Sequence, residues 1–205
     1  GLKVVFNSMI WVFLIANVFV NFCLGLMYAI LPIYANSLGG EEKYGYILTA
    51  ISIGMVLGSL ISTKLTKVPI GLFMSSSYVA AFILWGIAPY MSFSLFLLLF
   101  TLCFIPIGSA NIIIGSVMQS VIPLTIIGRT NSVMSSFSAV AMPIGSLIGG
   151  LLVRYFESSL VLSYAAIGFL MVGLIWLFNK KLRMLPNSET ISYKDFNITK
   201  ELIDI

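Results

Sequence analysis

The chain has 205 residues, of which 60% are apolar and only 9% are charged, and its formal net charge is +4. Soluble domains carry roughly a quarter charged residues, so this composition excludes a soluble globular protein and predicts an all-α integral membrane protein. None of the Lys and Arg residues falls in the middle of an apolar run, so the positive charge reflects loop placement and we expect no nucleic-acid partner.

Residues suited to catalysis or metal binding are missing from the sequence. There is no His, and Cys23 and Cys103 lie apart in apolar runs. The sequence also has no phosphate-binding loop of the Gly-x-x-x-x-Gly-Lys-Ser/Thr type. We therefore expect no enzymatic activity, metal site or cofactor. No signal-peptide pattern follows Gly1, and we expect the chain to follow an upstream segment.

Six apolar windows of roughly bilayer length run along the chain, at residues 8–35, 46–63, 68–88, 92–121, 130–153 and 159–178. Each is far longer than a barrel strand, and over such lengths only helices satisfy the backbone in lipid. The sequence predicts a six-span domain over residues 1–185. Residues 186–205 are polar, and we expect a mobile cytoplasmic tail with a short surface helix at 196–205.

The basic residues flank the spans unevenly. Seven fall on one side of the predicted spans, namely Lys3, Lys64, Lys67, Arg129, Lys180, Lys181 and Arg183. The other side receives only Lys43 and Arg154. By the positive-inside rule both termini are cytoplasmic, with cytoplasmic loops at residues 64–67 and 123–129.

A short sequence repeat links the two halves of the six-span region. Gly-Ser-Leu-Ile occurs at residues 58–61 and again at 145–148, and a Pro precedes each copy, at Pro32 and Pro123. A four-residue match by chance is the alternative. Six spans make two groups of three, and because three is odd a repeated unit is inverted relative to its copy. Inverted three-helix repeats are typical of transporters.

Small residues and prolines are placed where helices pack or bend. The fifth window contains Gly145-x-x-x-Gly149, a spacing that lets another helix approach closely. Prolines inside the windows break the hydrogen-bond ladder and favour bends, although Pro and Gly are in any case commoner in membrane helices than in soluble ones. The packing and hinge candidates are Pro32, Gly58, Pro106, Gly115, Pro143, Gly145 and Gly149.

Carboxamides inside two windows form polar helical faces. Asn17, Asn21, Gly25 and Tyr28 are spaced along one face of the first window. In the fourth window Gly108, Asn111, Gly115 and Gln119 form a second such face. Asparagine is disfavoured against lipid, so these faces point inward. The alternative is that the amides only bond helices together, at about 1 kcal/mol each. Trp11 and Trp176 fit interfacial anchors.

The residues from Gln119 onward carry a family resemblance. Gln119-x-x-Ile-Pro, then Gly128-Arg129, then Ala-Met-Pro143-x-Gly145 resembles the carboxyl-terminal half of major facilitator superfamily transporters. It is similar to the drug-exporter branch that includes bacterial macrolide-efflux and siderophore-export permeases, over nearly all of residues 1–183. The family's acidic loop residue is replaced by Ser62, so the charge-relay role of that loop is not carried over.

The resemblance implies half of a twelve-helix fold and secondary active export of drug-like or other amphipathic small molecules across a bacterial plasma membrane. It also implies a substrate cavity lined by Asn17, Asn21, Tyr28, Asn111 and Gln119. The expected partners are the lipid bilayer, a small-molecule substrate, and an amino-terminal six-span half or a second copy of the chain. The alternative is a half-length, non-transporting immunity or scaffold protein that binds a partner through the Gly-rich fifth window.

The position of the acidic residues bears on coupling. Glu41, Glu42 and Glu157 lie only between or at the ends of the windows, and no His is present. Proton coupling usually needs an ionisable group at membrane depth. If the whole transporter is proton-coupled, its titrating residue lies in the other half.

Overall fold

The computed structural model describes residues 2–196 and 198, which form helices joined by short connections, with no strand among them. The elements are α1 (Leu2–Asn7), α2 (Ile10–Ser37), α3 (Glu42–Ser62), α4 (Ile70–Ile87), η1 (Ala88–Tyr90), α5 (Phe93–Val121), α6 (Leu124–Leu152), α7 (Ser158–Tyr164), α8 (Ile167–Phe178), α9 (Lys180–Arg183) and η2 (Tyr193–Phe196). They supply six stretches long and apolar enough to cross a membrane. The predicted all-α, six-span fold is confirmed.

The connection before the fifth span is shorter than predicted. Lys64 and Lys67 do lie in a loop, between α3 and α4, but residues 124–129 are helical and Arg129 lies on the second turn of α6. The predicted loop at 123–129 is therefore wrong. Pro123 begins the helix with φ of −57°, and a proline suits this position because the first amide groups of a helix have no partner to lose.

The sixth span is broken between α7 and α8. The indole Nε1 of Trp85 on α4 donates a hydrogen bond of 2.8 Å to the carbonyl oxygen of Leu162. The Ser163 hydroxyl donates to the carbonyl oxygen of Gly86, at 2.5 Å. A side chain that captures a helix carbonyl interrupts the regular ladder. The amide of Ala166 bonds to the Ser163 carbonyl at 3.1 Å, and the helix resumes at Ile167.

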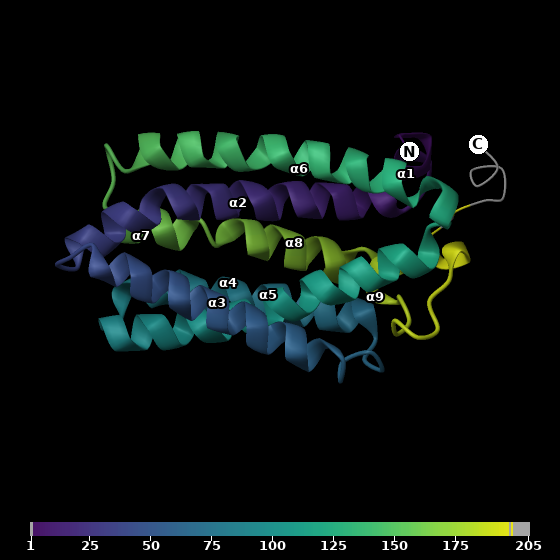
Figure 1. Cartoon of the computed structure of the whole chain (residues 1–205), viewed down its shortest axis with the longest axis horizontal. Coiled ribbons are helices and arrows are strands. Elements are labelled where there is room, and N and C mark those ends of the chain that lie inside the picture. Colours follow the sequence, from purple (N-terminus) through teal and green to yellow (C-terminus); the bar gives the residue numbers. More distant parts are fainter. Residues whose placement is uncertain (1, 197, 199–205) are drawn as a thin grey trace.

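The spans pair as an inverted repeat requires. The most extensive contacts join α2 to α6 and α3 to α5, and a third pair is formed by α4 and α8 (Figure 1). Exchanging the first three spans with the last three converts the α2–α6 pair into the α5–α3 pair and leaves the α4–α8 pair unchanged. Since α8 also contacts α2 and α4 also contacts α5, the third pair joins the other two.

Glycines bring the backbones of the two equivalent pairs together. A Cβ added at Gly145 would overlap the carbonyl oxygen of Phe22 on α2, and one added at Gly58 would overlap that of Ile105 on α5. Both glycines open a copy of the Gly-Ser-Leu-Ile repeat, so the two copies occupy corresponding helix crossings. The Gly145 contact bears out the packing predicted for the fifth span.

The tail does not extend away from the bundle. The amide of Ile70 donates to the carbonyl oxygen of Pro186 at 3.2 Å, and that of Ser188 donates to Thr66 at 3.2 Å. The side chain of Phe196 is fully buried. Residues 186–196 fold back over one end of the bundle, and their mobility stays a prediction. Apart from 196 and 198, the surface helix predicted at 196–205 lies outside the described residues.

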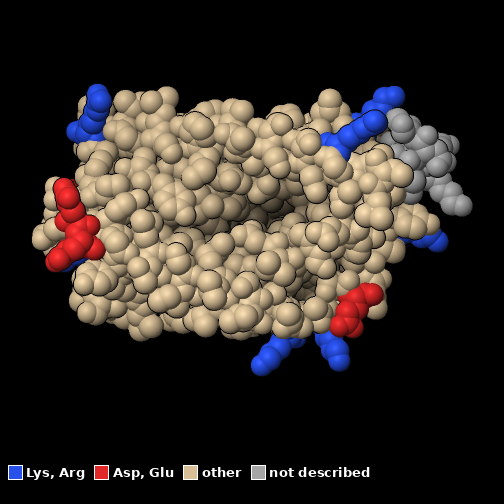
Figure 2. Space-filling view, viewed as in Figure 1, with Lys and Arg blue, Asp and Glu red and all other residues tan. Residues whose placement is uncertain are grey.

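Charged side chains gather at the two ends of the molecule. Figure 2 shows Lys, Arg, Asp and Glu side chains toward the two ends and along the lower edge to the right of centre, with none on the middle of the face in view. A charge-free band between charged ends is what a membrane-spanning bundle requires. The helices therefore lie along the direction that crosses the bilayer.

Alanine at Gly145 and Gly150 is expected to have opposite effects on stability. Gly145→Ala places a methyl group against the Phe22 carbonyl and should lower the free energy of unfolding by about 1–3 kcal/mol. A Cβ at Gly150 meets nothing within 4 Å, so Gly150→Ala should raise it by up to about 1 kcal/mol through helix propensity. Thermal unfolding of the purified chain in detergent measures both. Equal effects would contradict the close approach at Gly145.

Candidate functional site

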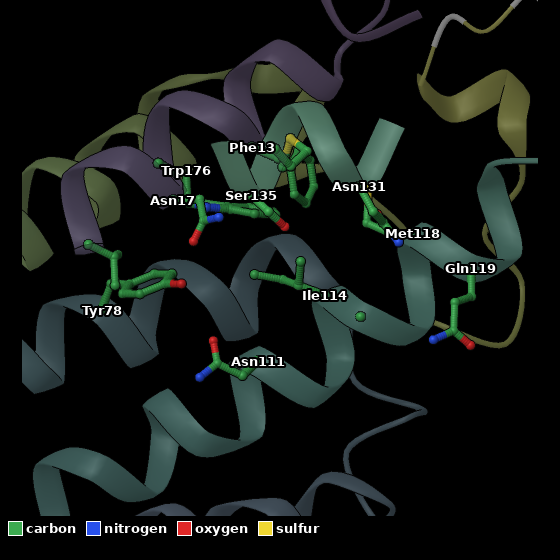
Figure 3. Close-up of a pocket in the computed structure, with 14 residues that line it drawn as sticks. Phe13, Asn17, Tyr78, Asn111, Ile114, Met118, Gln119, Asn131, Ser135 and Trp176 are labelled. Atoms are coloured by element: carbon green, nitrogen blue, oxygen red, sulfur yellow. The ribbon is translucent and has the colours of Figure 1, made fainter. Parts of the chain in front are cut away.

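A hollow lies between the α2–α6 pair and the α3–α5 pair (Figure 2). It contains a cavity of about 370 Å³ walled mainly by α2, α5 and α6, with one residue each from α4 and α8. Figure 3 shows Asn17 and Asn111 on opposite sides of it, with Gln119 and Asn131 toward one end. The cavity forms because contacts between the two helix pairs are sparse on this side, while α4 and α8 join the pairs behind it.

A second cavity of about 160 Å³ adjoins the first. The two share Asn17, Val20 and Asn111, and the second reaches Asn21 and Tyr28. All the residues that the sequence singled out as a cavity lining therefore lie along one hollow: Asn17, Asn21, Tyr28, Asn111 and Gln119. The structure brings them together; a role in binding substrate stays a prediction.

The amides of α2 are partly engaged inside the protein. Asn17 Nδ2 donates a hydrogen bond of 2.8 Å to the hydroxyl of Ser138 on α6. Asn21 Nδ2 donates to the main-chain oxygen of Asn17 at 2.9 Å and to its Oδ1 at 3.0 Å. Asn17 therefore bonds α2 to α6 and also lines the cavity, so the two alternative roles considered for this amide occur together.

The carboxamides of α5 have a different environment. Asn111 and Gln119 are exposed within the hollow, and no hydrogen bond to either side chain is present in the described part of the chain. A free carboxamide offers two N–H donors and an acceptor oxygen. These two side chains are therefore the groups best placed to bond a ligand or water.

Aromatic and thioether side chains form the apolar part of the wall. They are Phe13, Tyr78, Met118, Met134 and Trp176. Rings and thioethers offer large, adaptable apolar contact. Trp176 is only 1% exposed, so the interfacial anchor predicted for it is wrong. Trp11, at 44% exposed, fits that prediction.

Sequence reasoning missed two polar lining residues, Asn131 and Ser135 on α6. They are four residues apart and so share a helical face, which is the same signal that identified Asn17 and Asn21. Both lie in the fifth predicted window, 130–153, in which only Pro143, Gly145 and Gly149 were singled out. The structure places both on α6, where they line the cavity.

Three glycines lie differently from the predictions. Gly25 and Gly108 were placed on inward polar faces, but a Cβ at Gly25 would overlap the Met142 carbonyl, and one at Gly108 would lie 2.6 Å from the Met55 carbonyl. Both are helix-packing positions. Gly115 was predicted both on the inward polar face and as a packing or hinge position; a Cβ there meets nothing within 4 Å and the residue lines the cavity, which fits only the first prediction.

The other packing and hinge candidates are accounted for by helix geometry. A Cβ at Gly149 would lie 2.9 Å from the Leu26 carbonyl oxygen, so Gly149 packs against α2 as Gly145 does. Pro32, Pro106 and Pro143 each lie inside a helix assigned without interruption. A hinge at any of these prolines stays a prediction.

The walls of both cavities are uncharged. Their described lining residues include no Lys, Arg, Asp or Glu. Among the described residues no group of three His, Cys, Asp or Glu side chains could hold a metal ion. The hollow is thus suited to binding through hydrogen bonds and apolar contact, without ion pairing.

A family model described as transmembrane secretion effector matches residues 5–204 of the chain. Comparisons with curated proteins and with solved structures found no match.

Leucine at Asn17 and at Asn111 should separate structural from binding roles. Asn17→Leu removes the bond to Ser138 and should lower the free energy of unfolding by about 0.5–1.5 kcal/mol. Asn111→Leu removes no protein hydrogen bond and should change it by no more than about 0.5 kcal/mol. Thermal unfolding in detergent compares these two variants, which carry the same substitution. Greater destabilisation by Asn111→Leu would show that the amide on α5 is structural.

Proposed function

Because the chain belongs to the transmembrane secretion effector family, of the major facilitator type, we propose that it is the carboxyl-terminal six-span half of a secondary active exporter of amphipathic small molecules. Membrane transport is the activity common to this family. The observation that carries the finer proposal is the hollow between the helix pairs, whose uncharged walls combine free carboxamides with aromatic and thioether side chains.

The composition of the walls supports an amphipathic substrate without a strong net charge. The cavity of about 370 Å³ is within the usual range for small-molecule sites. An ionic substrate would lose its hydration there without gaining a counter-charge from the described lining residues. A compound with a few hydrogen-bonding groups on an apolar body would find both kinds of partner.

The open face of the hollow supports a second half. Figure 2 shows it uncovered along the face in view, and in transporters built from two repeats the substrate site lies where the repeats meet. We propose that an amino-terminal six-span half, or a second copy of this chain, covers it. In a proton-coupled transporter that partner would supply the titrating group, since the described walls here hold no carboxylate.

The non-transporting alternative has less support. It needs the Gly-rich face of the fifth span to be free for a partner. Gly145 and Gly149 on α6 instead face the main chain of Phe22 and Leu26 on α2. That face is occupied within the chain, which favours transport over the immunity or scaffold protein.

The proposed orientation places both termini in the cytoplasm of a bacterial cell, from the uneven distribution of Lys and Arg. Single cysteines at Lys67 and Glu42, in a background of Cys23→Ala and Cys103→Ala, should label differently with an impermeant thiol reagent in intact cells. We expect reaction at residue 42 and protection at residue 67, because these residues lie in the connections at opposite ends of α3. Equal labelling at both would contradict the orientation.

The export activity is testable with the missing half supplied. Co-expression with a six-span amino-terminal half from the same family should lower the accumulation of a macrolide in drug-sensitive bacteria. Asn111→Leu should weaken this effect roughly tenfold, since one hydrogen bond to a substrate is worth about 1.5 kcal/mol. The matched control is Ile112→Leu, the next residue on α5, whose side chain is exposed but does not line the cavity.

Two results would contradict the proposal. One is macrolide accumulation equal to that of cells without the chain, with both halves present in the membrane. The other is full export by the chain alone as a monomer, measured after reconstitution in liposomes, because transport would then need no second half to cover the hollow.

A further inference from the structure

The C-terminal segment, residues 191–196 and 198, packs against the bundle, and the proposed export gives no reason for this packing. Phe196 is fully buried and Ile198 is 3% exposed, whereas Lys194 and Asp195, the two residues before Phe196, are exposed. Buried apolar side chains within a polar stretch indicate that this segment packs at one specific position on the bundle.

That position lies between the ends of the two helices that carry the cavity amides. The amide of Met9, just before α2, donates a hydrogen bond of 2.9 Å to the carbonyl oxygen of Phe196. The turn η2 also contacts α5. The segment therefore bridges the start of α2, which carries Asn17, and α5, which carries Asn111.

Phe196 stands directly behind the cavity wall. Its ring centroid lies 5.3 Å from that of Phe13, and the Phe13 centroid lies 5.1 Å from that of Trp176. Phe13 and Trp176 both line the cavity of about 370 Å³. The three rings form a layer between the cavity and the end of the molecule where the charged residues of the tail are exposed.

The side-chain hydrogen bonds within the segment and just before it are close to solvent. The Asp195 carboxylate accepts hydrogen bonds from the Ser192 amide at 2.8 Å and from its hydroxyl at 3.0 Å, and both bonds are exposed. Just before Ser192, the Thr66 hydroxyl donates a hydrogen bond of 2.9 Å to the carboxylate of Glu189. Apart from a few buried apolar side chains, Phe196 and Ile198 among them, the segment is at least partly exposed, so it opens at lower free energy than the spans do.

We propose that this segment is a latch: with Phe196 seated, the cavity is closed toward this end of the bundle, and release of the segment opens a path between α2 and α5. The proposal goes beyond export, because it concerns access of water-soluble molecules to the cavity and does not depend on whether the chain transports anything.

Thiol labelling in membrane vesicles tests the latch. Ala16 lines the cavity one turn beyond Phe13 and is 7% exposed, so Ala16→Cys in the Cys23→Ala, Cys103→Ala background reports access. Lys194→Cys, in a separate protein, identifies the side of the membrane on which the segment lies. From that side, Phe196→Ala should speed labelling of residue 16 at least about tenfold, because loss of a buried ring outweighs the free energy of a tenfold change.

Matched variants separate a latch from general loosening. Lys194→Ala changes an exposed side chain of the same turn and should leave the rate unchanged, and Phe196→Leu should be intermediate. Asp195→Ala removes the acceptor of both Ser192 hydrogen bonds and changes no buried side chain. If Phe196→Ala fails to reach the membrane, the labelling rate in Asp195→Ala is measured in its place. An unchanged labelling rate of residue 16 in Phe196→Ala, or in Asp195→Ala where that variant replaces it, overturns the latch. An equal rise in the rate from both sides of the membrane also overturns it.

Discussion

Close backbone contact within two equivalent helix pairs is the constraint on which the rest of the structure depends. Lipid provides no hydrophobic drive for helices to associate, so contact distance and hydrogen bonds must do so. Gly25 and Gly145 let α2 and α6 touch, and the Ser146 hydroxyl donates to the Gly25 carbonyl oxygen at 2.9 Å. In the α3–α5 pair the Ser109 hydroxyl donates to the Gly58 carbonyl oxygen at 2.7 Å.

The hollow is a consequence of this pairing. Each pair is tight within itself, and α4 and α8 tie the pairs together on one side only. The opposite side therefore keeps a gap whose walls are α2, α5 and α6. Asn21 lies one turn before the tight crossing at Gly25, and Asn111 lies about one turn after the crossing at Gly108, so each amide is held at the edge of the gap by the same contact that creates it.

The sequence was sufficient where the signal is local. Apolar length predicted the six spans, and the spacing of polar residues along a helix placed Asn17, Asn21, Tyr28, Asn111 and Gln119 on faces that line the hollow, because both signals depend on one helix at a time. The sequence was insufficient for features that depend on contact between two segments far apart in the chain. The break in the sixth span depends on Trp85 reaching Leu162, and the packing of the tail depends on Phe13 meeting Phe196. Gly108 and Gly115 look alike in sequence, but only the first lies where α5 crosses α3.

The amides on the two sides of the hollow differ in whether they are hydrogen-bonded within the protein. Asn17 is bonded to Ser138 and Asn21 is bonded to Asn17, so rotating either side chain toward a ligand would break a protein hydrogen bond. Asn111 and Gln119 carry no such cost among the described residues. A ligand shifts a conformational equilibrium only by its difference in affinity between states. A change in the distance between the free amides of α5 and the engaged amides of α2 would provide such a difference without any charge in the described walls.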